Sequence, residues 1–317
     1  MDFMSLALLV VSFVVLVKSS EVCVRNLAAL ARYLCLSEFA ISFIVVGLAS
    51  VLPELSVATV AAAEGSPDMA IAVLFGSNIA DFTLILGLLA IYARGLKVES
   101  KVRHGSKTLL ALMALPIVLL IVGNGLSKLD GLILIAAYFY YLRKIIGRHD
   151  GLSNALCNIS NNRHDFAKHI VIGIAALAVL FVSAGVASDS AIKIATDIGL
   201  PAVLMGLIIA LGTCAPEFTL AVQAIRKGHS EMGAGDIVGN IATDATLSIG
   251  IVALLSPVAP AFQAVALSGF VMVAAGALAI HFMQKGRKIT LNEGLALVFV
   301  YIAFIAFQFG TQARIIT

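Results

Sequence analysis

Four acidic residues lie inside otherwise apolar stretches of this chain, where a carboxylate is energetically costly. Glu54 and Asp81 are separated by 27 residues, and Glu217 and Asp244 repeat the same spacing further along the chain. Acids inside a membrane segment usually bind an ion, relay a proton or pair with a positive charge. These four are therefore the first candidates for the chemistry of the protein.

The two pairs of acids belong to an internal repeat. Residues 41–87 align without a gap on residues 204–250 at an offset of 163, and 12 of the 47 positions are identical. Chance similarity between apolar helices would match leucine and alanine, but not a Pro-Glu pair followed 27 residues later by aspartate. Further identical positions are Gly65/Gly228, Gly76/Gly239 and Gly87/Gly250.

Hydroxyl and amide side chains accompany the acids in both repeats. The predicted site consists of Glu54, Glu217, Asp81, Asp244, Ser50, Thr213, Ser77 and Asn240. Such an all-oxygen set suits Ca²⁺, which takes six to eight oxygen ligands, and no His or Cys cluster favours a softer metal. Without ions the acids would repel one another, so we expect one divalent ion or several monovalent ions or protons. Occupancy of one site by two kinds of cation in turn is antiport. We predict no cofactor, only transported Ca²⁺ and Na⁺ or H⁺.

The composition indicates which elements position these residues. Of 317 residues, 61% are hydrophobic and 12% are charged, about half the charged share of a soluble domain. The chain is predicted to be an all-α polytopic membrane protein, and the lipid bilayer is its expected surrounding. The net charge of +3 gives no reason to expect nucleic acid, and no protein partner is predicted. Ten apolar segments are expected at 3–17, 38–63, 69–92, 108–125, 129–146, 167–186, 199–225, 232–255, 262–283 and 291–309.

Loop charges give the orientation of these segments. With the N-terminus outside, 18 of the 21 lysines and arginines fall on the cytoplasmic side, and only Lys128, Lys193 and Arg314 do not. The predicted domains are a first half at 1–146, a cytoplasmic linker at 147–166 and a second half at 167–317. Each half has five helices, an odd number, so the halves enter the membrane in opposite directions. We expect both termini outside, in the plasma membrane.

An inverted repeat of this kind is the plan of secondary transporters, whose ion sites lie near the membrane midplane on interrupted helices. The expected interruptions lie at Pro53 and Pro216, because proline removes an N–H and displaces the carbonyl four residues before it. These carbonyls belong to Ala49 and Gly212. A bound cation is one partner for carbonyls freed in this way.

The segments GLASVLPE (47–54) with GSNIAD (76–81), and ALGTCAPE (210–217) with GNIATD (239–244), resemble the two alpha-repeats of the sodium/calcium exchanger branch of the calcium/cation antiporter superfamily. The resemblance implies a ten-helix inverted-repeat fold, Ca²⁺ movement against Na⁺ or H⁺, and a site built on the paired glutamates. It also implies that the first and sixth helices slide against the others.

The chain departs from the family pattern where sodium ligands are expected. The serine of Gly-Thr-Ser-x-Pro-Glu is replaced by Val51 and Cys214, and Asn240 stands where Gly-Ser-Asn would place a second serine. Aspartate occupies both 81 and 244, whereas sodium/calcium exchangers often pair aspartate with asparagine. The resemblance favours Na⁺ coupling, while the missing hydroxyls and the additional acid favour H⁺ coupling. Both alternatives stay open.

Two other classes of protein are less consistent with the sequence. A cation channel can be lined by acids, but such pores usually come from rings of subunits. The segment Gly233-Ala-Gly-Asp236 matches the GxGD motif of intramembrane aspartyl proteases, yet no Tyr-Asp motif supplies a second catalytic acid. We therefore predict a transporter and not an enzyme, and the role of Asp236 is not assigned.

Overall fold

The computed structural model describes residues 3–33, 47–98, 100–146, 163–226, 230–257, 262–286 and 288–316. The first half contains α1 (Phe3–Tyr33), α3 (Gly47–Ala63), α4 (Pro67–Ala80), the π-helical segment η2 (Asp81–Ile85), α5 (Leu86–Tyr92), strand β1 (Leu96–Lys97), α6 (Ser100–Gly123) and α7 (Lys128–Ile146). The second half contains α8 (Arg163–Ile198), α9 (Ala202–Thr213), α10 (Ala215–Arg226), α11 (Ser230–Thr243), the π-helical segment η3 (Asp244–Ser248), α12 (Ile249–Leu255), α13 (Phe262–Lys285), strand β2 (Lys288–Ile289) and α14 (Leu291–Ile316).

Where the structure describes them, the ten predicted apolar segments are helical except at residues 124–125, 199–201 and 214. Seven contain a stretch that is long and apolar enough to cross a membrane: Phe3–Cys23, Pro67–Tyr92, Gly105–Gly123, Phe166–Ile198, Ile237–Leu255, Val265–Lys285 and Leu291–Gly310. The other three correspond to α3, which is described from Gly47 onward, to α9 with α10, and to α7. Helix α7 contains no sufficiently long apolar stretch because charged residues lie at both of its ends.

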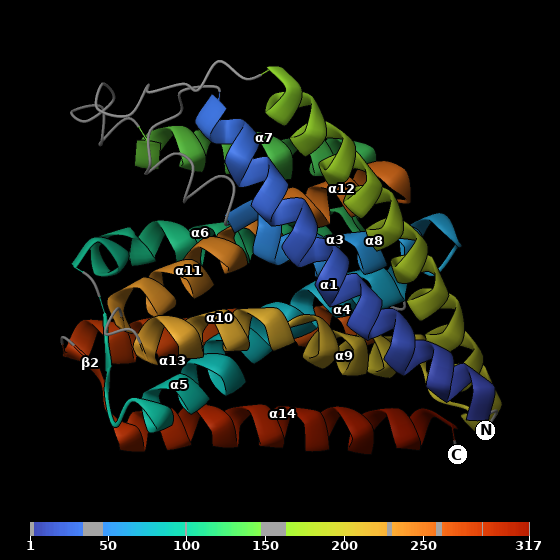
Figure 1. Cartoon of the computed structure of the whole chain (residues 1–317). Helices are drawn as coiled ribbons and strands as arrows, with labels where there is room; N and C mark the ends of the chain where they lie inside the picture. Colours follow the sequence, from blue (N-terminus) through green and yellow to red (C-terminus); the bar gives the residue numbers. More distant parts are fainter. Residues whose placement is uncertain are drawn as a thin grey trace.

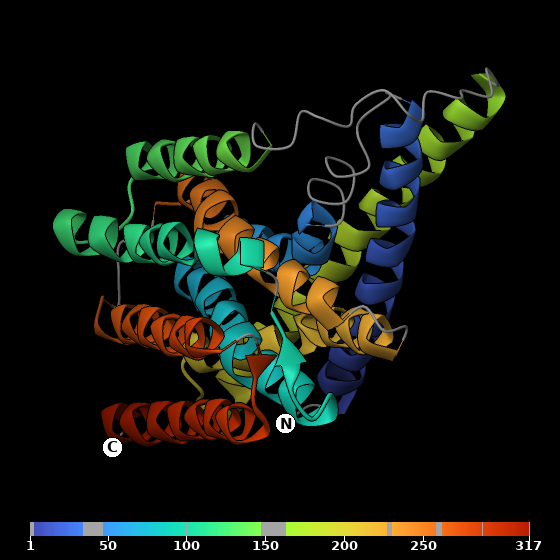
Figure 2. The same cartoon turned by 90° about the vertical axis from the view of Figure 1, so that its left-hand side faces the viewer.

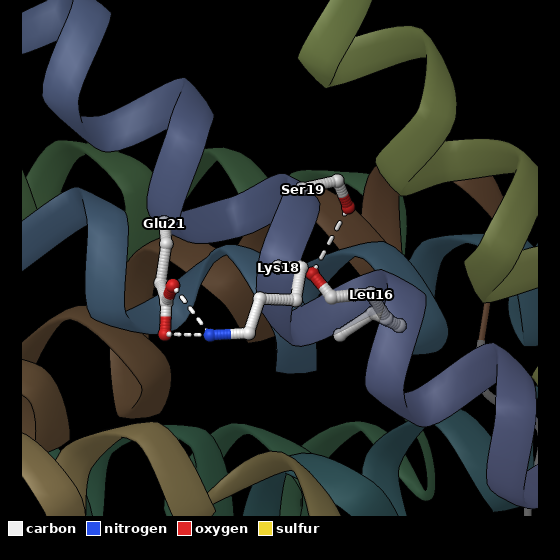
Figure 3. Close-up of polar contacts among 4 residues, drawn as sticks. All are labelled: Leu16, Lys18, Ser19 and Glu21. Carbon is white, nitrogen blue, oxygen red and sulfur yellow. Dashed lines mark hydrogen bonds and ion pairs between the residues drawn. The ribbon is translucent and has the colours of Figure 1, made fainter.

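Several helices are longer than their predicted segments, and α1 and α8 extend furthest beyond them. The predictions at 3–17 and 167–186 followed hydropathy, whereas α1 continues to Tyr33 and α8 to Ile198. Figure 3 shows how α1 passes its first charged turn: Lys18 Nζ lies 3.0 Å from Glu21 Oε2, and Ser19 Oγ donates to the carbonyl of Leu16. Both charged side chains are exposed, so the helix continues past the apolar segment without burying a charge.

The repeats interrupt their helices differently. In the second repeat the helix breaks at Cys214, two residues before Pro216, and separates α9 from α10. In the first repeat α3 runs through Pro53 without a break, contrary to the prediction. Both repeats also contain a π-helical segment that begins at the aspartate. In these segments the N–H of Leu86 donates to the carbonyl of Asp81, and that of Ile249 to the carbonyl of Asp244, each five residues back.

The helices form three layers. Figure 2 shows α7, α6, α13 and α14 stacked in a row on one side and the long helices α1 and α8 on the other. The helices of the two repeats lie between them. Helices α1 and α8 lie side by side in both views and contact α3 and α9 of the middle layer (Figure 1). The middle layer is thus covered on both sides, which buries the acid-bearing segments.

Matching contacts reveal the symmetry of the two halves. The bounds of α4, η2 and α5 reappear 163 residues later as those of α11, η3 and α12. The capping box at the start of α7, in which the N–H of Ser127 donates to Asp130 Oδ2 at 2.8 Å, is matched at α14 by Thr290 and Glu293, also at 2.8 Å. The repeat seen in sequence is therefore a repeat of three-dimensional contacts.

Glycine allows two symmetric pairs of helices to cross with their backbones in contact. A Cβ on Gly87 of α5 would lie 2.7 Å from the carbonyl oxygen of Gly294 on α14. The equivalent crossing joins α7 and α12, where a Cβ on Gly131 would lie 2.7 Å from the carbonyl oxygen of Gly250. These crossings hold the π-helical segments against the outer row of helices.

We expect Gly250→Ala to lower the stability of the protein, because its Cβ would lie 2.8 Å from Ile135 Cγ1 and 2.9 Å from the Gly131 carbonyl oxygen. Overpacking of this kind costs about 1–3 kcal/mol. The measurement is thermal unfolding of the purified protein in detergent. Gly310→Ala is the control, because nothing lies within 4 Å of its Cβ and alanine favours helix. Equal unfolding temperatures for the two variants would contradict the proposed crossing.

Candidate functional site

The four acids predicted from the sequence all lie in the buried middle layer. Glu54 lies on α3, Glu217 in the first turn of α10, and Asp81 and Asp244 open η2 and η3. Each is at most 1% exposed. The fold therefore gives all four the surroundings in which a carboxylate needs a compensating partner.

The two aspartates are joined to the opposite repeat by crossed hydrogen bonds. Ser77 Oγ on α4 donates to Asp244 Oδ2 at 3.0 Å, and Asn240 Nδ2 on α11 donates to Asp81 Oδ2 at 2.9 Å. Ser77 and Asn240 occupy equivalent positions of the two repeats, as do the aspartates. The repeats thus meet through two symmetric bonds, which place four of the predicted site residues together.

Glu54 lies close to both aspartates, and their negative charges repel its own. The hydroxyl of Thr213 is beside it but has a closer partner in the carbonyl of Ala210, at 3.0 Å. Within the described residues neither carboxylate oxygen of Glu54 has a hydrogen-bond partner of normal geometry. Glu54 is consequently an acceptor group that a cation or a proton would stabilise.

Cys214 lies near all four acids of the candidate site. Its side chain is 1% exposed, lies within electrostatic range of all four acids, and places Sγ 3.9 Å from the carbonyl oxygen of Ser77. At the end of α9 this residue therefore contacts α4, against which α9 packs. In this way the break connects Glu217 and Thr213 to the residues around the aspartates.

The acidic side chains alone do not suffice to coordinate a metal ion. Among the described side chains, no three of type His, Cys, Asp or Glu approach closely enough to hold one metal ion. Additional oxygen comes from amides: Asn240 Oδ1 and Asn78 Oδ1 are buried and have no hydrogen-bond partner among the described residues. Asn78 was not predicted, although it belongs to the Gly-Ser-Asn stretch. Ser248, which donates to Asp244 Oδ1 at 2.9 Å, was also missed.

One predicted ligand and one unassigned acid cannot be placed. The side chains of Ser50 and Asp236 lie outside the part of the chain that the structure describes, although their backbones are helical. Seven of the eight predicted site residues are therefore located, and all seven are buried. They come from both repeats, and no single segment of the chain contains the site.

Apolar spanning helices, an inverted repeat and buried acidic, amide and hydroxyl side chains from both halves define an integral membrane protein of the cation-exchanging transporter class. The family model described as sodium/calcium exchanger protein matches residues 4–146 and 168–310, and the chain belongs to this family. Membership makes it a transporter by class.

Similar proteins cover nearly the full length of the chain. The putative antiporter CaxA of Alkalimonas amylolytica is 28% identical over 313 residues, covering 94% of this chain and 96% of that protein. The sodium/calcium exchanger MaX1 of Methanosarcina acetivorans is 24% identical over 346 residues, covering 95% and 97%.

Two solved structures share the fold. A structure of the sodium-calcium exchanger NCX_Mj has a TM-score of 0.67 at 24% identity, covering 96% of this chain and 99% of its own. The structure of the H⁺/Ca²⁺ exchanger CAX has a TM-score of 0.79 at 18% identity, covering 98% and 87%. At these identities the likeness extends to the fold alone, and the fold accommodates exchangers named for either counter-ion.

Restoring a hydroxyl at Cys214 should strengthen Na⁺ binding, because a hydroxyl oxygen is a better ligand than a thiol for a hard cation. We expect Cys214→Ser to lower the Na⁺ concentration that half-displaces bound ⁴⁵Ca²⁺ by about threefold to tenfold, as for one added polar contact. Cys23→Ser is the control, since Cys23 is also buried and unoxidised but lies on α1. An unchanged Na⁺ titration for Cys214→Ser would contradict a cation position beside this residue.

Proposed function

We propose that this chain is a secondary active antiporter that exchanges Ca²⁺ for Na⁺ by alternating access. The observation that carries the proposal is the crossed pair of hydrogen bonds, Ser77 to Asp244 and Asn240 to Asp81, which joins buried acids of inverted repeats. Sequence relatives named as an antiporter and as a sodium/calcium exchanger support it.

In this proposal Glu54 and Glu217 bridge the Ca²⁺ ion, with Ser50 and Thr213 supplying further oxygens. Asp81 and Asp244 flank it with Ser77 and Asn240 and hold Na⁺, a proton or water. Carboxylate, hydroxyl, amide and main-chain oxygens would together coordinate the ion, because no three acids meet at one point in the described part of the chain. No cofactor takes part.

The moving element is the pair α1 and α8. Small residues on both sides of their contact support sliding: Gly212 of α9 meets the ring of Phe13, and Gly185 of α8 meets Val60 of α3. A polar bond holds the pair together, since His169 Nδ1 lies 2.8 Å from Asn26 Oδ1, while Asn26 Nδ2 donates to the carbonyl of Val22 at 2.7 Å. The pair therefore moves as one unit. A site filled with cations permits the movement, whereas an empty, charged site opposes it.

The orientation belongs to the proposal, with both termini outside the plasma membrane and residues 147–166 as a cytoplasmic linker between domains 1–146 and 167–317. One contact supports it. Strand β1 pairs antiparallel with β2, Leu96 with Ile289 and Lys97 with Lys288. Both strands come from loops that the charge distribution places in the cytoplasm, so these two loops do lie on one side.

The alternative counter-ion is H⁺, and a specific observation favours it. Position 214 offers sulfur where the family expects a hydroxyl, and positions 81 and 244 both carry acids that accept hydrogen bonds from the opposite repeat. Fewer sodium ligands and one more titratable group suit proton exchange. A channel is the alternative of a different class, and it would conduct Ca²⁺ without a counter-ion on the opposite side.

Calcium uptake into proteoliposomes tests this function, with a Na⁺ gradient and a pH gradient imposed separately. We expect uptake under the Na⁺ gradient; uptake under the pH gradient alone supports the H⁺ alternative, and uptake with neither indicates a channel. Glu54→Gln and Glu217→Gln should each abolish uptake, because each removes a negative charge from the bridging pair. Near-normal uptake by either variant would overturn the assignment of these two residues.

A second variant addresses the counter-ion. Asp81→Asn removes a titratable group and leaves the aspartate–asparagine combination common among sodium/calcium exchangers. We expect Ca²⁺ transport to persist while its dependence on pH and Na⁺ changes. The measurement is the initial rate of uptake across a matrix of pH values and Na⁺ concentrations. Profiles that overlay those of the unmodified protein would contradict a counter-ion role for Asp81.

A further inference from the structure

One of the differences between the two halves of the site lies at the end of the π-helical segments. The segments η2 and η3 each begin at the aspartate and span five residues, so Ile85 and Ser248 occupy equivalent last positions. Ser248 is fully buried and its hydroxyl donates to Asp244 Oδ1 at 2.9 Å, one helical turn away. Ile85 has no polar atom with which to do the same for Asp81. At this position the two repeats therefore differ in a side chain, Ser248, that contacts the proposed ligand Asp244.

The Ser77 hydroxyl lies near two acceptors, so its hydrogen bond to Asp244 is not permanent. The Ser77 hydroxyl lies 3.0 Å from Asp244 Oδ2 and also 3.0 Å from the carbonyl oxygen of Leu74. It has one hydrogen, so it satisfies one of these acceptors at a time. For Ser248 no competing acceptor is found among the described residues. Asp244 consequently keeps the hydrogen bond from Ser248 whichever way the Ser77 hydroxyl turns.

We propose that Ser248 is a positioning residue that anchors Oδ1 of Asp244 and so directs Oδ2 toward the transported cation. When the hydrogen of Ser77 turns to Leu74, the Ser77 oxygen and Asp244 Oδ2 both face the same point with lone pairs available. The anchor keeps the Asp244 side chain in place while this exchange occurs. The inference rests on the proposed function, and it identifies the second repeat as the half whose acid is held ready for the ion.

The other half is arranged in a different way. Asn240 donates through Nδ2 to Asp81 Oδ2, and this leaves Asn240 Oδ1 as the oxygen available to a cation. On that side the amide is both the holder of the acid and a candidate ligand. On the Asp244 side these two tasks are divided between Ser248 and Ser77. The site is thus asymmetric within a symmetric fold.

The test is equilibrium binding of ⁴⁵Ca²⁺ to the purified protein, together with KM and maximal rate of Ca²⁺ uptake in proteoliposomes. Ser248→Ala should weaken Ca²⁺ binding and raise KM about tenfold, as for loss of a hydrogen bond to a charged group, with the maximal rate within about twofold. Ser248→Thr keeps a hydroxyl and should recover most of the affinity. Thr246→Val is the matched control, because Thr246 lies in the same π-helical segment, is equally buried, and donates to the carbonyl of Ala242 at 2.6 Å.

The outcomes separate this inference from the proposed function. If the unmodified protein binds Ca²⁺ but Ser248→Ala binds it equally well, the positioning role is wrong and the antiporter proposal stands. If Ser248→Ala and Thr246→Val weaken binding to the same degree, the effect is general loosening of η3 and the role is again wrong. If the unmodified protein neither binds nor transports Ca²⁺, both proposals fail. Should Ser248→Ala not fold, Ser248→Thr with affinity close to that of the unmodified protein, set against Ser248→Val with weak binding, supports the role.

Discussion

The cost of burying carboxylates is the constraint on which the rest of this structure depends. Four acids lie in the middle layer with almost no exposed surface, and each would be unstable there without a donor or a cation. The surrounding helices supply donors in part: Ser77, Ser248 and Asn240 serve the two aspartates. They leave Glu54 without a hydrogen bond among the described residues. The remaining stabilisation of the buried acids is expected to come from bound cations. Ion binding would therefore also contribute to the stability of the fold.

Inverted symmetry is the means by which one chain builds such a site. Each repeat carries its own aspartate and the donor for the aspartate of the other repeat, so neither repeat is complete alone. The glycine crossings of α5 with α14 and of α7 with α12 hold the two π-helical segments against the outer row of helices. A rearrangement that opens the site to one side has a symmetric counterpart that opens it to the other. The two halves are nevertheless not identical, since Cys214 and Ser248 correspond to Val51 and Ile85 in the first repeat.

Much of this arrangement could be predicted from the sequence, and the limits are physical. The offset of 163 predicted which residues correspond, and the structure brings Asp81, Asp244, Ser77 and Asn240 together as that symmetry requires. Hydropathy placed the helices but not the ends of α1 and α8, because an exposed ion pair such as Lys18–Glu21 extends a helix without extending its apolar segment. Proline predicted a break that occurs before Pro216 but not at Pro53. Ser248 was missed because its role depends on a helical turn that begins at Asp244, and spacing alone does not reveal that turn.

The bond between α1 and α8 determines which ring nitrogen of His169 carries a hydrogen. The amide nitrogen of Asn26 is occupied by the carbonyl of Val22, so its oxygen must accept from His169, and the ring carries its hydrogen on Nδ1. The imidazole thus connects the two helices through Nδ1. In the proposed transport cycle this bond lies inside the moving pair of helices and stays intact while the pair slides.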